Sequence, residues 1–222
     1  MKMSKDSMTR LMRVVRIGTA FGSAIFAVSA LQAQSPAPVA PQAPAAGNSA
    51  DLSHQAKEFL QFAAQANQTE MAMADLAQAK SQNSAVKDLA QMMHSDHQQN
   101  YAQLQSIAQG RGVALDGSLS FMNQRAVNRL QKVSDADIDK EYTTLMIKDH
   151  VHAIKRFDKA VAEIEEPTVK AYAQSTLPAL RKHLQHAEIA ARSAGVDEAT
   201  ISSMLKELPS EEAQRGVSFN QN

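Results

Sequence analysis

The sequence predicts an all-α protein, a bundle of four long helices arranged as two hairpins. The composition favours helices, because alanine, glutamine, methionine, leucine and lysine are abundant and only 8 of the 222 residues are glycine. Apolar residues recur three or four positions apart through four long stretches, which is the period of one helix face. Short breaks join these stretches in pairs and a long segment separates the pairs, which predicts two antiparallel hairpins.

The first 33 residues have the order of a cleaved Sec-type signal peptide. Basic residues precede an uncharged apolar run from Ile17 to Leu31, and small residues follow. We expect cleavage between residues 30 and 33, because roughly 15 apolar residues are few for the alternative, an uncleaved membrane anchor. The mature chain is then expected in the periplasm or outside the cell. Residues 34–50 are rich in proline and alanine and predict a disordered linker.

The first predicted hairpin consists of helices at about 53–80 and 84–109. Ser53 or Asp51 is the expected cap of the first helix, and Gly110 and Gly112 are expected to end the second. The remaining expected elements are a connection over 110–133 that holds a short amphipathic piece at 121–133, helices at 135–165 and 167–194, and a weak last helix at 197–207 before a polar tail. The bundle should therefore occupy residues 51–195, with 196–222 as a short helix and tail.

Each long helix carries one ionisable residue where its apolar stripe requires a core residue. These residues are Glu70, His97, His150 and His183. Glu70 lies 12 residues before the first break at Gln82 and His97 lies 15 after it, while His150 and His183 lie 16 and 17 residues from Glu166. At about 1.5 Å per residue, the two members of each hairpin sit at similar height. This arrangement, with one long crossover, is typical of ferritin-like bundles.

Sequence segments around these four residues resemble a known family. The matching segments are QTEMAMADLAQAK, KDLAQMMHSDH, YTTLMIKDHVH and LPALRKHLQHAEIA. They resemble an uncharacterised, secreted, ferritin-like family, domain of unknown function 4142, sometimes labelled predicted outer-membrane protein, over about residues 50–195. The resemblance implies a four-helix ferritin-like fold and a non-cytoplasmic location, and no established activity. The Glu-x-x-His pattern of di-iron proteins is His-x-x-His here, which argues against ferroxidase chemistry.

The four core residues predict a metal site. Three neutral histidines and one carboxylate suit a divalent transition metal such as zinc, iron, copper or manganese, and they fit one ion better than two. Asp96 and Asp149 each precede a core histidine and are expected in the second shell or at the surface. His94 and His186 would extend the site or cap its edge. The rival interpretation is a metal-free network of buried hydrogen bonds among the same residues.

Several functions are disfavoured by what the sequence lacks. The formal net charge is zero, so no nucleic-acid surface is indicated, and we find no nucleophile–base pattern or glycine-rich phosphate loop. We therefore expect a secreted protein that binds a transition metal between its helices, in metal handling or envelope stress, with an envelope or membrane-associated partner as an option. The alternatives are a metal-dependent oxidase or peroxide-consuming enzyme, and a metal-free structural or interaction module.

Overall fold

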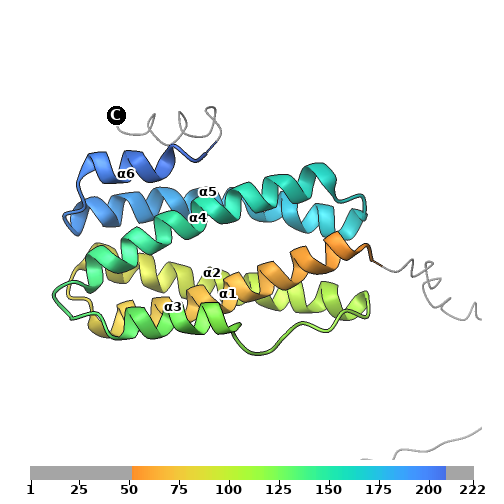
Figure 1. The fold of residues 1–222 in the computed structure, drawn as a ribbon, viewed down its shortest axis with the longest axis horizontal. Helices are drawn as coiled ribbons and strands as arrows, with labels where there is room; N and C mark the ends of the chain where they lie inside the picture. The colour runs from red at the N-terminus through yellow and green to blue at the C-terminus, as the bar shows by residue number, and fades with distance from the viewer. Residues whose placement is uncertain (1–51, 209–222) are drawn as a thin grey trace, which may run out of the picture. The chain divides into compact units, whose positions relative to one another are not determined.

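The computed structural model describes residues 52–208, which form an all-α, ferritin-like four-helix bundle with a short C-terminal helix (Figure 1). This confirms the predicted fold class. The predicted signal peptide, the linker and the tail beyond residue 208 lie outside the described residues. The helices are α1 (His54–Lys80), α2 (Ser84–Gly110), α3 (Phe121–Gln131), α4 (Ile138–Glu163), α5 (Pro167–Ser193) and α6 (Glu198–Leu205).

Two helical hairpins make the bundle. α1 packs along α2 and α4 packs along α5, while the hairpins meet through contacts of α1 with α4 and of α2 with α5. Figure 1 shows the hairpins as two layers, with α3 beside α1 and α6 beside α4 and α5. Each long helix therefore presents one face to a common core.

The crossover between the hairpins is held against α1. Gly112 turns the chain after α2 with a φ of 64°, in the left-handed region that favours glycine. Further along, Gln65 of α1 donates from Nε2 to the carbonyl of Ser118 at 2.8 Å and accepts from the backbone N–H of Ser120 at 2.6 Å. These bonds satisfy backbone groups that have no helical partner, so the crossover keeps a defined path to α3.

The first helix of the second hairpin, α4, is shorter at both ends than the sequence pattern predicts. α4 begins at Ile138 rather than at 135, because the carbonyl of Ser134 accepts from the backbone N–H groups of Asp137 and Ile138, which closes a turn first. It ends at Glu163 rather than at 165. The side chain of Glu166 caps α5 by accepting from the N–H of Val169 at 2.6 Å, so the segment before it is already extended.

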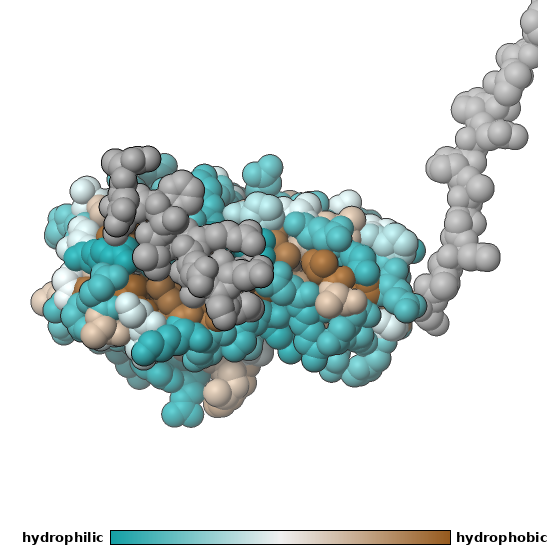
Figure 2. Space-filling view, turned by 90° about the horizontal axis from the view of Figure 1, so that it is seen from above, coloured by the Kyte–Doolittle hydropathy of each residue, from teal (hydrophilic) through white to brown (hydrophobic). Residues whose placement is uncertain are grey.

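The core contains an aromatic cluster at one level and the four ionisable residues at another. Phe59 and Phe157 have ring centroids 4.9 Å apart, and Tyr172 lies 6.0 Å from Phe157. On the face drawn in Figure 2, the visible described residues are mostly hydrophilic around hydrophobic patches. Within residues 52–208, no helix combines the length and apolar character needed to cross a membrane.

Candidate metal centre

Glu70, His97, His150 and His183, one from each long helix, meet in the core of the bundle. All four are buried, and none is more than 4% exposed. The Oε2 atom of Glu70 lies 3.0 Å from Nε2 of His97 and 3.6 Å from Nε2 of His150. The Nε2 atom of His150 lies 3.2 Å from Nδ1 of His183. One ring nitrogen from each of the three histidines lies within 4.8 Å of the others.

The hydrogen bonds of the outer ring nitrogens define which nitrogen of each histidine carries a proton. His150 donates from Nδ1 to the carbonyl of Met146 at 2.9 Å, because a carbonyl can only accept. His183 donates from Nε2 to Oδ2 of Asp96 at 2.9 Å for the same reason. Each neutral ring then has its lone pair on the nitrogen that faces the centre of the cluster.

His97 follows the same rule through Asn67. The amide nitrogen of Asn67 donates to the carbonyl of Ala63 at 2.8 Å and to Oδ1 of Asn100 at 2.9 Å. Its Oδ1 is therefore the acceptor for Nδ1 of His97 at 2.9 Å. The Nε2 atom of His97 and the Oε2 atom of Glu70 have no hydrogen-bond partner within residues 52–208, although both are buried. Three nitrogen lone pairs thus face one another, and the carboxylate oxygen of Glu70 lies against two of these nitrogens.

Three of the separations among these atoms are close to those of ligands around a single ion. Ligands about 2.0–2.1 Å from a tetrahedral ion lie about 3.3–3.4 Å from one another. The measured separations of 3.0, 3.2 and 3.6 Å lie on both sides of that value. With all three rings neutral, the 3.2 Å contact of His150 with His183 brings two lone pairs face to face. A cation between them would remove this repulsion.

Electrostatics keep the cluster in the protonation states that bind metal. Burial raises the pKa of Glu70, but the imidazoles of His150, His97 and His183, which are protonated in acid, outweigh burial and hold the pKa at about 2. Burial lowers the pKa of His150. Burial, with His150 and His97 nearby, lowers the pKa of His183 to about 4. At neutral pH an ionised carboxylate therefore faces two neutral imidazoles, as metal ligation requires.

The structure separates the other residues that the sequence analysis named. Asp96 of α2 accepts from Nε2 of His183 across the helix interface, so it orients this ring from outside the cluster. His94 faces away from the cluster and pairs with Asp75 of α1 at 2.8 Å. His186 is exposed on α5. Neither His94 nor His186 takes part in the contacts of the cluster.

Asp149 lines a different cavity from Asp96. It lines a cavity of about 260 Å³ between α1, α3 and α4, which Glu70 also lines. Burial, followed by the charge of Glu70, raises the pKa of Asp149 to about 7. Asp149 is therefore a carboxyl group that the folded chain keeps partly protonated at neutral pH.

The sequence analysis missed the polar network that orients His97. Asn100 accepts from Asn67 and from the hydroxyl of Tyr172 at 2.7 Å, and it donates to Oγ1 of Thr176 at 3.2 Å. A sequence signal was available, since Asn67 lies three residues before Glu70 and Asn100 three after His97. Polar residues at that spacing share a helix face with the proposed ligands.

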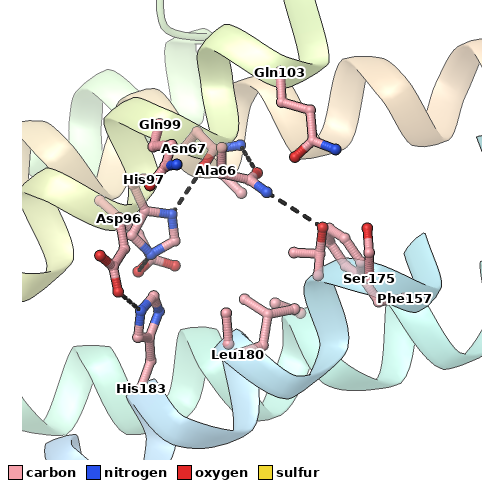
Figure 3. A pocket seen from close by; sticks show the side chains of 15 residues that line it. Ala66, Asn67, Asp96, His97, Gln99, Gln103, Phe157, Ser175, Leu180 and His183 are labelled. Atoms are coloured by element: carbon pink, nitrogen blue, oxygen red, sulfur yellow. Dashed lines mark hydrogen bonds and ion pairs between the residues drawn. The ribbon is translucent and has the colours of Figure 1, made fainter. Parts of the chain in front are cut away.

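A second cavity, of about 300 Å³, adjoins the cluster on the side of Asn67 and His183 (Figure 3). Figure 3 shows His97, Asp96 and His183 together at one end of this cavity and Gln103 and Ser175 at the other. Residues of all four long helices line it. The side chains of the cluster are therefore buried, but a cavity lies beside them.

Comparison with known proteins supports the fold and identifies the family. No curated protein is significantly similar to the chain in sequence. Among solved structures, the crystal structure of a DUF305 fragment from Deinococcus radiodurans is similar, with a TM-score of 0.56, 18% sequence identity, and coverage of 64% of this chain and 98% of that one. At this identity the likeness concerns the fold alone. The family described as Domain of unknown function (DUF4142) matches residues 41–189, and the chain belongs to that family.

Proposed function

We propose that this protein binds one divalent transition metal ion through Glu70, His97, His150 and His183. The observation that carries the proposal is that one nitrogen of each of three buried imidazoles lies within 4.8 Å of the others. The carboxylate oxygen of Glu70 lies 3.0 and 3.6 Å from two of these nitrogens. The acceptors on the outer ring nitrogens support it, because histidine ligands of metals almost always donate their other N–H to such a group.

The rival metal-free network fits the contacts less well. A network built for stability should satisfy its buried polar atoms, since each unsatisfied atom costs about 1–3 kcal/mol. Here, with the proton of His97 on Nδ1, the Oε2 atom of Glu70 and the Nε2 atom of His97 lie 3.0 Å apart with no hydrogen between them. The contact of His150 with His183 is repulsive when both are neutral. A bound cation accounts for both features at once.

Zinc is the ion that this donor set favours, because zinc is commonly four-coordinate and tetrahedral with histidine and carboxylate ligands. Copper, iron and manganese are the other ions to test, since imidazole also suits the first two and carboxylate the third. The basic and apolar order of residues 1–33 supports a periplasmic or secreted location. Metal handling in the cell envelope is the role we propose for such a protein.

Elemental analysis tests the proposal directly. The full-length chain, expressed without a histidine tag and purified without chelators, should contain about one equivalent of a transition metal per chain. The same preparation of His150→Ala should contain almost none. A metal content that is equally low in wild type and variant, even after incubation with zinc, copper, iron or manganese, would overturn the proposal.

Asp96→Asn should weaken metal binding by about 10- to 100-fold, because the carboxylate orients His183 and makes it more basic. Titration against a chromophoric chelator measures this loss. Asp75→Asn is the matched control, since Asp75 contacts His94 outside the cluster, and it should leave the affinity within about 2-fold of wild type. Equal losses in both variants would show that Asp96 has no special role.

A further inference from the structure

We propose that the cavity beside the cluster binds a small, uncharged, hydrogen-bonding molecule, which reaches the bound metal from the side of His97 and His183. This inference rests on the proposed metal site and extends it. A metal held by four protein ligands in a closed core would have a storage or structural role. A metal with open space beside it accepts an additional ligand, and zinc sites do expand to five ligands.

The position of the cavity supports an entry path to the metal. Its volume of about 300 Å³ is at the lower end of the range for small-molecule sites. Glu70, His97 and His183 line it, so a molecule inside would lie beside three of the four proposed ligands. Its lining also includes exposed residues, among them Gln103 and Ala179. The cavity therefore connects the cluster with the surface.

The residues that line the cavity disfavour anions. Glu70 and Asp96 are carboxylates at the inner end, and no lysine or arginine is found among the described residues that line the cavity. The two carboxylates balance the charge of a divalent ion, so an anion that enters would add a net negative charge beside the buried Glu70, which is costly. An uncharged molecule avoids this cost.

The lining also offers unused hydrogen-bonding groups opposite an apolar wall. Gln99 and Gln103 are exposed at the rim, and their side chains make no hydrogen bond within residues 52–208. Figure 3 shows the amide of Gln103 above the space between His97 and Ser175. Phe157 and Leu180 form part of the opposite wall. A ligand with one polar edge and one apolar edge fits this division.

Imidazole is a suitable probe, because it is small, can ligate a metal and is mostly uncharged at about pH 8.5. Cobalt(II) replaces the native ion, since its visible spectrum reports changes in its ligands. We expect imidazole to change the spectrum of the cobalt-loaded full-length protein in a saturable manner. Azide, an anion of similar size, should bind at least about 10-fold more weakly than imidazole after each affinity is divided by that for aqueous cobalt.

Two tryptophan variants test the path. Ala179→Trp should fill the mouth of the cavity and weaken imidazole binding by at least about 10-fold while cobalt binding is unchanged. Ala171→Trp, at an exposed position of α5 that does not line the cavity, should leave both affinities within about 2-fold of wild type. Ser175→Trp, at another exposed lining position, should repeat the effect of Ala179→Trp.

The outcomes separate the two proposals. If neither cobalt nor zinc, copper, iron or manganese binds, the metal proposal fails and this inference fails with it. If cobalt binds but imidazole leaves the spectrum unchanged, the metal site stands and the inference is overturned. Imidazole binding that is equally strong in Ala179→Trp and Ser175→Trp would also overturn it, because the molecule would then reach the metal by another route. Azide binding as strong as imidazole binding would overturn the proposed selectivity for uncharged molecules.

Discussion

Zinc should stabilise the metal-free protein, and His150→Ala or His183→Ala should abolish the gain. A ligand that binds the folded state alone raises the free energy of unfolding by about 2.7 kcal/mol at 100 times its dissociation constant. His150 and His183 each supply one lone pair from a buried position, held by hydrogen bonds of the opposite ring nitrogen, so neither is replaced by a neighbouring side chain or by water without loss. Thermal or urea unfolding with and without zinc measures the difference.

His54→Ala is the control for this prediction. His54 begins α1, is exposed and contacts Glu58 at 3.3 Å, far along the helix from Glu70. Its removal should leave the zinc-dependent gain within about 0.5 kcal/mol of wild type. If zinc, copper, iron and manganese all fail to stabilise wild type at neutral pH, while His150→Ala destabilises the metal-free protein, the metal-free network is the correct interpretation.

The level of each core residue along its hairpin could be predicted, because the rise of a helix per residue does not depend on the rest of the chain. Once two helices form a hairpin, residues equally far from the break lie side by side, whatever the rest of the chain does. Glu70 and His97 of one hairpin and His150 and His183 of the other needed no further information. The two pairs of residues also meet each other, with atoms 3.0–3.6 Å apart within the cluster. This meeting depends on how the hairpins pack, which the sequence pattern does not determine.

Contacts across helix interfaces were harder to predict. Asp96 is adjacent to His97 in sequence, yet its carboxylate reaches His183 of α5, and that direction depends on how α2 and α5 pack. His186 lies three residues after His183 but is exposed, because no neighbouring helix covers that edge of α5. The cavity depends on small residues such as Ala66, Ala153 and Ala179 lying opposite one another. A single sequence gives the period of a helix but not the partner of each face.

Asp149→Asn should stabilise the metal-free protein at alkaline pH. The pKa of Asp149 is raised to about 7 in the folded chain, whereas an unfolded aspartate has a pKa near its model value of 3.8. The unfolded state thus loses its proton first, and the stability conferred by the protonated carboxyl falls as the pH rises from about 4 to about 7. His183 has the opposite sign, because its pKa is lowered to about 4 and its contribution is lost as the pH falls below about 6.5.

The side chain introduced by Asp149→Asn does not ionise. The substitution therefore removes the loss of stability that ionisation of Asp149 causes as the pH rises. We expect the difference in free energy of unfolding between Asp149→Asn and wild type to widen by about 2 kcal/mol from pH 5 to pH 8, after allowance for partial exposure. Urea unfolding of metal-free protein across this range measures it. Asp88→Asn, at an exposed position of α2, should retain the pH dependence of wild type. A difference for Asp149→Asn that stays constant with pH would show that Glu70 and burial do not hold the proton on Asp149.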